Sequence, residues 1–382
     1  MKKFLKDNKK IVIRISILIT LLVALLTLNI FQNNTQICEW WTRTISRFYQ
    51  TGIGFMFKYI PFSMMEILVI ALVIYATYLL VRLIIYLVKK RWISALNNGL
   101  LMGILALSVV VGYVATTSLA YYRSDVPIPL YEEKVDKSKF NEVVKYFLDD
   151  FNYCSSTLEY DENGEVKLPY NYLELSKRIS KEYEKLDDPY FSSFTTNPKP
   201  MLSSFLYVQF QITGMYSGLT GEVNFDTFMT HAEYPFTFAH EIAHSKGVMR
   251  ENDAQLVAAY ICLNSEDDFI RYSGYIYTFA SLMNLCSFTG NKGDYQLMYS
   301  LMNEDIKHNY NFINKYWKEH DLLEKIGTFF NDLYLKIFGS ESTDEYKDPP
   351  IVIDPGTNEI VSFYRYQKLY FQKYIDDGNN LN

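Results

Sequence analysis

The segment PFTFAHEIAHSKGVMRENDAQ, residues 235–255, decides what we expect of the fold. Its centre is His240-Glu241-Ile242-Ala243-His244, and the whole chain contains only five histidines. Residues four apart share one face of a helix, so both histidines can approach a single metal ion. Imidazole nitrogen suits zinc, and Glu241 beside the first histidine can accept a proton from an attacking water. The spacing therefore predicts a helix that carries a zinc site, with His240 and His244 as ligands and Glu241 as the catalytic base.

The flanking residues predict where this helix begins and ends. Pro235 precedes the first turn, a position that proline favours, and Gly247 can end the helix in a left-handed conformation. The chain can then reverse and supply the third protein ligand that a catalytic zinc site usually has. Glu251 and Asp253 are the candidates; Glu251 is preferred, and Asp253 would then steady a ligand histidine. Arg250 stands where the metzincin motif has its third histidine, which excludes that motif.

Two structural interpretations of the motif remain open. The helix could lie on the surface with its histidines paired to nearby acids, or the zinc could be purely structural, which would require a fourth protein ligand. Further along, Tyr272 lies in the segment Arg271-Tyr272-Ser273-Gly274-Tyr275, and its hydroxyl could donate to the oxyanion of a tetrahedral intermediate. The chain has 33 tyrosines, so packing is the alternative role for Tyr272.

The rest of the soluble part is expected to be mostly helical. Residues 221–229 alternate polar and apolar side chains, as a half-buried strand does. At an exposed sheet edge this strand could pair with an extended peptide, and an ordinary core strand is equally consistent. Helices are expected at residues 135–150, 170–186, over most of 235–338, and 359–375, with a loop at 347–356. The fold class we predict is α+β, mostly helical, with a small antiparallel sheet.

Three apolar segments near the N-terminus are long enough to cross a membrane. Each holds about 20 residues or more, which as a helix spans the hydrocarbon core of a bilayer. They run over residues 11–31, 64–88 and 96–121. The first follows several lysines, but its apolar stretch is longer than the core of a secretory signal and no cleavage site follows it. We therefore expect a retained anchor.

The basic residues predict the orientation of these spans. The N-terminus is rich in lysine, and Lys89, Lys90 and Arg91 separate the second and third spans. Both segments should face the cytoplasm by the positive-inside rule. Three spans from an inside start leave the C-terminal part outside. The expected organisation is a membrane domain over residues 1–121 and an extracytoplasmic domain over 122–382.

The composition excludes some partners. The formal net charge is −6, which argues against nucleic acid, because phosphate binding requires a basic patch. The four cysteines form no C-x-x-C pair, so a thiolate zinc site is not expected, although one disulfide bridge is conceivable. The expected partners are the lipid bilayer and a peptide or protein substrate.

Several segments resemble a family of bacterial membrane proteins, each with a few N-terminal spans and an extracytoplasmic zincin-like domain. The resemblance rests on Thr213-Gly214-Met215-Tyr216, on residues 220–224, on the 235–255 segment and on residues 271–275. The family pattern after the glycine is similar to Arg-Glu-x-Glu-Ala-Asn, whereas this chain has Arg250-Glu251-Asn252-Asp253-Ala254-Gln255. The stretch from Glu251 to Ala254 also resembles the Glu-x-x-Ala-Asp of membrane gluzincins, which implies Glu251 as the third zinc ligand. The family supplies no substrate.

These observations together predict a membrane-anchored, zinc-dependent metallopeptidase of the gluzincin type. One rival is an intramembrane protease, but the residues that flank the motif, such as Glu233 and Lys246, are too polar for hydrocarbon. A second is a catalytically silent sensor or scaffold, for which Glu241 would be unnecessary. A third is a zinc hydrolase that acts on wall material.

Overall fold

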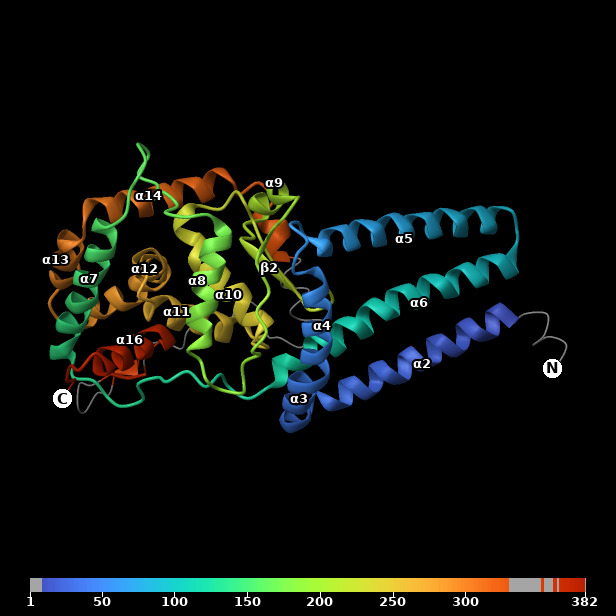
Figure 1. Ribbon diagram of the computed structural model, residues 1–382, viewed down its shortest axis with the longest axis horizontal. Helices are drawn as coiled ribbons and strands as arrows, with labels where there is room; N and C mark the ends of the chain where they lie inside the picture. Colours follow the sequence, from blue (N-terminus) through green and yellow to red (C-terminus); the bar gives the residue numbers. More distant parts are fainter. Residues whose placement is uncertain (1–8, 330–351, 354–359, 363, 382) are drawn as a thin grey trace. The chain divides into compact units, whose positions relative to one another are not determined.

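The computed structural model describes residues 9–329, 352–353, 360–362 and 364–381. The chain folds into two compact units (Figure 1). The first comprises residues 1–124 together with Ser217–Glu222, and the second comprises Asp125–Tyr216 and Val223–Asn382. The expected boundary at residues 121 and 122 falls close to the first of these divisions. The return of residues 217–222 to the first unit was not expected, and nothing local in that segment predicts it.

The first unit contains three helices that are long and apolar enough to cross a membrane. They are α2 (Lys9–Phe31), α5 (Met64–Val88) and α6 (Trp92–Thr116), and the 3-10 helix Ser118–Tyr122 continues the last of them. Their bounds agree with the three expected spans to within a few residues. Arg14 near the start of α2 donates to the side-chain oxygen of Asn97 near the start of α6, at 2.7 Å. The two helices therefore begin at the same end of the unit.

A helical segment connects the first two spans. It consists of α3 (Thr35–Trp41), a π-helical turn (Thr42–Ser46) and α4 (Arg47–Phe57). The Trp41 indole and the Ser46 hydroxyl both donate to the carbonyl oxygen of Ala115, at 2.8 and 2.7 Å. These bonds satisfy a carbonyl in the last turn of α6, which has no partner within the helix.

Residues 217–222 bind to the first unit through hydrogen bonds at the start of α5. The Glu222 side chain is fully buried, and its carboxylate accepts from the backbone N–H groups of Met64 and Met65 at 3.2 and 2.8 Å. A carboxylate at a helix N-terminus is favoured because it pairs with free N–H groups and with the positive end of the helix dipole. Glu222 therefore acts as a second cap beside Ser63, whose hydroxyl accepts from the Glu66 N–H.

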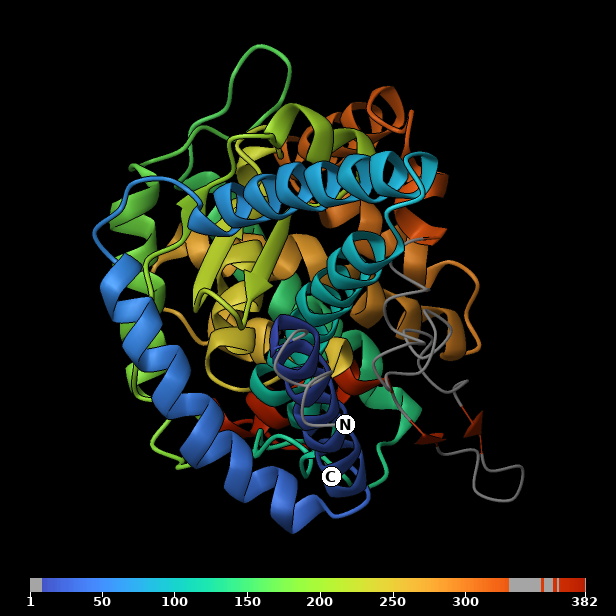
Figure 2. The ribbon, with the colours of Figure 1, turned by 90° about the vertical axis from the view of Figure 1, so that its right-hand side faces the viewer.

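The second unit is a helical bundle built around one central helix (Figures 1 and 2). That helix, α12 (Asp268–Met283), appears end-on in Figure 1, with other helices on every side. Around it lie α7 (Phe140–Ser156), α8 (Tyr172–Glu184), α9 (Ser204–Tyr207), α10 (Tyr234–Ser245), α11 (Glu251–Leu263), α13 (Asp294–Leu301), α14 (Glu304–Glu319) and α16 (Arg365–Asp376), with 3-10 turns at Lys137–Lys139, Val208–Phe210, His231–Glu233 and Asn284–Phe288.

Helical spacing of apolar residues explains this packing. In α7, Phe140, Val143, Val144, Phe147 and Phe151 recur every three or four residues, and all five are fully buried. Burial of each phenylalanine side chain contributes about 1.5–3 kcal/mol to the stability of the folded chain. The expected helices at residues 135–150 and 170–186 correspond to α7 and α8, although their ends differ. The helix expected at 359–375 is found only from Arg365 onward, as α16, and the prediction was wrong at Ile360–Ser362, which form a strand. The expectations for residues 330–338 and most of 347–356 lie outside the described residues, and the described part of the expected loop, Val352–Ile353, is a strand.

The second unit also contributes to a small sheet beside the helices. Its strands are β1 (Lys199–Pro200), β2 (Gly214–Ser217) and β3 (Glu222–Phe225), in the order β1-β3-β2. β1 runs parallel to β3, so the sheet is mixed and not antiparallel as expected, whereas the predicted class, mostly helical with a small sheet, is confirmed. The strand expected at residues 221–229 is β3, which covers only Glu222–Phe225. It is buried and lies between β1 and β2, so it is not an edge strand of this sheet. A separate antiparallel pair joins β4 (Val352–Ile353) and β5 (Ile360–Ser362).

Candidate metal centre

The expected helix of the motif is α10, and it ends where the sequence predicts. Pro235 occupies its first turn. Gly247 has a φ of 96°, the left-handed conformation that glycine adopts at low cost. The Val248 N–H then donates back to the Ala243 carbonyl at 3.1 Å, which closes the helix end. The reversal allows α11 to begin at Glu251, only seven residues after His244.

Three side chains meet at this reversal and could hold a metal ion. One ligand atom each from His240, His244 and Glu251 lies within 4.8 Å of the others. The His240 Nε2 atom is 3.1 Å from the His244 Nε2 atom and 3.1 Å from the Glu251 Oε2 atom. The His244 Nε2 atom is 3.6 Å from the same carboxylate oxygen. Each side chain is largely but not completely buried, so the cluster retains access to solvent.

The orientation of His244 is fixed from its other ring nitrogen. The Nδ1 atom lies 2.7 Å from the carbonyl oxygen of Val248. A carbonyl only accepts, so Nδ1 carries a proton, and Nε2 is the ring nitrogen that faces the cluster. Such a bond from the far ring nitrogen is the usual way in which proteins orient a metal-binding histidine.

The cluster is electrostatically coupled. Burial disfavours a charged His244, but the Glu251 carboxylate outweighs that effect and raises the pKa of the imidazole to about 9. Burial likewise opposes ionisation of Glu251, but His244 and His240 hold the pKa of its carboxyl well below the ordinary value. Glu251 is therefore a carboxylate at neutral pH, the form that binds metal ions.

Glu241 is buried beside the cluster and held by strand β2. Its side chain is 6% exposed, and burial raises the pKa of its carboxyl against the opposing effect of the two histidines. The backbone N–H of Tyr216 is near enough to this carboxylate to oppose that rise in pKa. The Oε2 atom is buried and has no hydrogen-bond partner among the described residues. The Oε2 atom is therefore available to accept a proton.

Gly214 makes room for Glu241. A Cβ atom at position 214 would lie 2.6 Å from Glu241 Cγ and 2.7 Å from its Oε1 atom, closer than real side chains approach. The Tyr216 ring also faces His244, with the ring centroids 6.5 Å apart. The sequence offered no chemical reason to select Gly214 or Tyr216. Both lie in the segment 213–216, which carries part of the family resemblance, but their contact with the site is not evident from the sequence because β2 approaches α10 only in the folded chain.

Asp253 does not touch a ligand histidine, contrary to the expected supporting role. Its carboxylate accepts from Arg250 Nε at 2.6 Å and from Arg365 at 2.7 Å, and the side chain is buried. Glu251 and Asp253 are two residues apart on α11, which places them about 200° apart around the helix axis, so only one of them can face the histidines. Val248 provides the hydrogen bond to His244 instead.

Tyr272 is a core residue, so its proposed catalytic role is wrong. It is fully buried, and its hydroxyl donates to the Asn309 side chain at 3.1 Å. Its ring packs against Phe151 at a centroid distance of 5.4 Å. A side chain enclosed in this way cannot reach a substrate.

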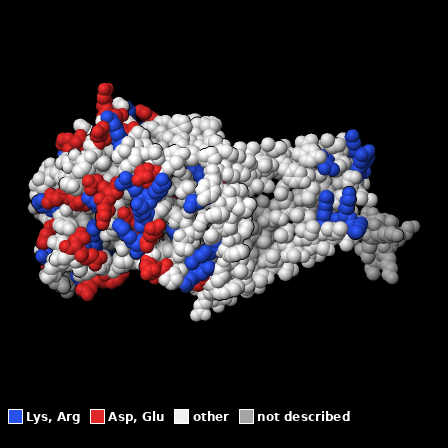
Figure 3. Space-filling model, viewed as in Figure 1, with Lys and Arg blue, Asp and Glu red and all other residues white. Residues whose placement is uncertain are grey.

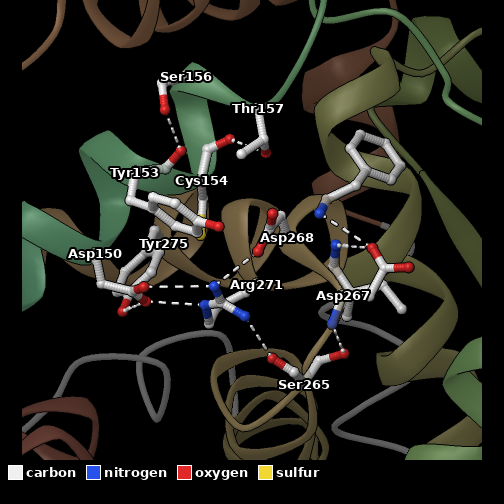
Figure 4. Close-up of polar contacts among 12 residues, drawn as sticks. Asp150, Tyr153, Cys154, Ser156, Thr157, Ser265, Asp267, Asp268, Arg271 and Tyr275 are labelled. Carbon is white, nitrogen blue, oxygen red and sulfur yellow. Dashed lines mark hydrogen bonds and ion pairs between the residues drawn. The ribbon is translucent and has the colours of Figure 1, made fainter.

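The segment around Tyr272 instead fixes α12 to the elements that surround it. Arg271 donates to Asp150 on α7 at 2.9 Å, to Asp268 at 2.8 Å and to the Ser265 carbonyl at 2.8 Å, and Tyr275 donates to Asp150 at 2.6 Å (Figure 4). These bonds link α12 to α7 and to the loop after α11.

Two small residues of the same segment contact the motif helices directly. The Ser273 hydroxyl accepts from the Phe236 N–H at the start of α10, at 3.1 Å. At Gly274, an added Cβ atom would lie 2.9 Å from the Cβ atom of Cys262 on α11. α12 therefore holds α10 and α11 in place. All four cysteines, Cys262 included, are free and buried, so the structure contains no disulfide bridge between them.

Comparison with known proteins gives one match. No curated protein and no solved structure matches the chain. A family described as a protein of unknown function, DUF3810, matches residues 41–348. The matched region includes the second and third spans, strands β1 to β3 and the whole His240, His244 and Glu251 cluster. The chain therefore belongs to the DUF3810 family.

Proposed function

We propose that this protein is a membrane-anchored, zinc-dependent metallopeptidase. The convergence of His240, His244 and Glu251 is the observation that carries the proposal. Two atoms bonded to a tetrahedral zinc at about 2.0–2.1 Å lie about 3.3 Å apart. The three distances in the cluster, 3.1, 3.1 and 3.6 Å, bracket that value. Two nitrogens and one oxygen also make a donor set that suits zinc and leaves a fourth position open.

Each residue of the site has a role in the proposed reaction. Zinc, when bound, would supply Lewis-acid chemistry by polarising a peptide carbonyl and making water more acidic. Glu241 would accept the proton of the attacking water at its unpaired Oε2 atom and pass it to the leaving amine. Tyr216 and Gly214 would keep that carboxylate in one orientation. The Val248 carbonyl would hold the Nδ1 proton of His244 and so keep the Nε2 atom turned toward the metal.

We place the second unit outside the cytoplasm. Lys9 and Lys10 at the start of α2 lie at the same end of the first unit as Lys89, Lys90 and Arg91, because α2 and α6 begin side by side. Figure 3 draws basic side chains together at this end of the spans. By the positive-inside rule that end faces the cytoplasm, and the segment after α6 emerges on the other side. A peptide or protein outside the membrane is then the substrate.

Replacement of Glu241 by glutamine tests the proposed reaction. Glutamine keeps the shape of the side chain but cannot accept the proton, so turnover should fall by about 10²- to 10⁴-fold while zinc content stays the same. The measurement is the rate at which new peptide termini appear when the full chain is incubated with a peptide library and followed by mass spectrometry.

Glu304→Gln serves as the matched control, because the Glu304 side chain is 73% exposed on α14 and far from the cluster in sequence. This variant should cleave the library as the parent does. Undiminished cleavage by Glu241→Gln would overturn the assigned base. A parent that binds zinc but cleaves no peptide would overturn the peptidase proposal and favour a sensor or scaffold.

A further inference from the structure

Large apolar side chains are exposed together on one side of the second unit. Phe205 and Leu206 on α9 are 61% and 44% exposed, and Phe228, just after β3, is 53% exposed. Leu322 and Ile326, in the segment after α14, are 80% and 47% exposed. We call these five residues the apolar patch.

Hydrogen bonds hold the three segments that carry the patch beside one another. The Thr227 N–H donates to the Ser204 hydroxyl at 3.0 Å, which brings Phe228 beside α9. The Leu323 N–H donates to the Gln209 carbonyl at 3.0 Å, which joins residues 322–326 to the turn after α9. The Tyr316 hydroxyl donates to the Phe228 carbonyl. Three segments distant in sequence thus present their apolar side chains on one surface.

The patch is unusual for a surface in contact with water. Figure 3 shows no charged side chains on the surface over α9, whereas basic and acidic side chains cover the parts of the unit farther from α9. Soluble surfaces seldom expose a contiguous apolar area of this kind unless something covers it. Phenylalanine and leucine are also the side chains that interfacial segments insert among lipid headgroups.

We propose that the apolar patch inserts into the outer face of the lipid bilayer that holds the three spans. The bilayer is the partner that the chain always has, because the same chain carries spans of 23, 25 and 25 residues. Phe228 follows Glu222, which belongs to the unit of the spans, by only six residues. Six residues reach at most about 20 Å, so only a short length of chain joins Phe228 to the unit of the spans. The proposal is independent of the zinc chemistry.

Insertion would restrict the substrates that the second unit can meet. A domain that is fixed on the bilayer by a second contact, in addition to its spans, cannot tumble freely on its linker. It would act on chains presented near the membrane surface rather than on proteins in bulk solution. This consequence, unlike the insertion itself, rests on the proposed function.

Fluorescence quenching by lipids tests the insertion. The full chain is reconstituted in nanodiscs of phosphatidylcholine with and without a headgroup-level spin-labelled lipid. Tryptophan is introduced in Phe228→Trp and, separately, in Leu322→Trp, so that a folding defect in one variant leaves the other informative. The matched control is Leu297→Trp on α13, which is 53% exposed like Phe228 and lies at the opposite end of the unit in Figure 1. The signal is the quenching of each variant beyond that of the parent, which has four tryptophans.

Several-fold greater quenching of Phe228→Trp and Leu322→Trp than of Leu297→Trp is the expected result. Equal quenching at all three positions would overturn the proposal. Protection of the patch positions from both the lipid quencher and an aqueous quencher such as iodide would also overturn it, because a second protein copy, and not lipid, would then cover the patch.

Discussion

At the scale of single residues, Gly214 is the position where the smallest change should have the largest effect on activity. A methyl group there would displace Glu241, whose Cγ atom would lie 2.6 Å away. A displacement of about 1 Å at a catalytic group can cost about 100-fold in rate, so Gly214→Ala should lower turnover by about 10- to 100-fold. Zinc content should stay the same, because Glu241 is not a ligand in the proposed site.

Gly293→Ala is the control for this prediction. An added Cβ atom at Gly293 would meet nothing closer than 3.5 Å, and the residue has an ordinary negative φ. The two variants are compared by cleavage rate and by zinc content per chain. If Gly214→Ala retained full activity, strand β2 would have no part in orienting Glu241.

The sequence predicts those site residues whose placement is local. His240, Glu241 and His244 follow from helical spacing, and the left-handed Gly247 explains how Glu251 can return to them. Gly214 and Tyr216 could not be predicted, because β2 approaches α10 only in the folded chain. The roles expected of Asp253 and Tyr272 were wrong. The sequence does not reveal that Asp253 pairs with two arginines or that Tyr272 is enclosed in the core.

At the scale of elements, α12 supports the helices that carry the motif. Arg271 is its main polar link, with a side chain that is 14% exposed and paired with Asp150 and Asp268. Removal of one partner from a largely buried ion pair leaves the other charges uncompensated, so Arg271→Ala should lower the free energy of unfolding by about 2–4 kcal/mol.

An exposed ion pair provides the comparison for Arg271. Lys145 and Asp149 on α7 are 53% and 62% exposed, and such a pair contributes only about 0.5 kcal/mol. Thermal unfolding of the full chain in detergent measures both effects. Equal, small shifts for Arg271→Ala and Lys145→Ala would mean that α12 is held by apolar packing alone.

Helices were predicted better than the sheet for a physical reason. The apolar period of α7 and the capping signals of α10 lie within one segment, so the sequence displays them directly. Strand pairing joins distant segments, and β1 meets β3 through the register of Lys199 with Asn224, 25 residues apart. No local pattern indicates that this pairing is parallel or that β3 is the middle strand.

At the scale of the whole molecule, the two units are interleaved in sequence. Residues 217–222 belong to the unit of the spans, although the segments on both sides belong to the other unit. Apolar length alone predicts the spans, and the break near residue 124 follows from the end of the last one. The excursion of residues 217–222 depends on bonds such as those of Glu222 to α5, which no composition profile reveals.

The zinc content of the purified full chain, measured beside Glu251→Ala and Asp253→Asn, is the most direct test of the proposed metal centre. The parent should hold about one zinc per chain, as a three-ligand catalytic site does. Glu251→Ala should lose most of it, because its carboxylate lies 3.1 Å from His240 Nε2, whereas Asp253→Asn should retain it, because that side chain faces two arginines. A folded parent without zinc, or a Glu251→Ala variant that binds as much zinc as the parent, would contradict the proposed site.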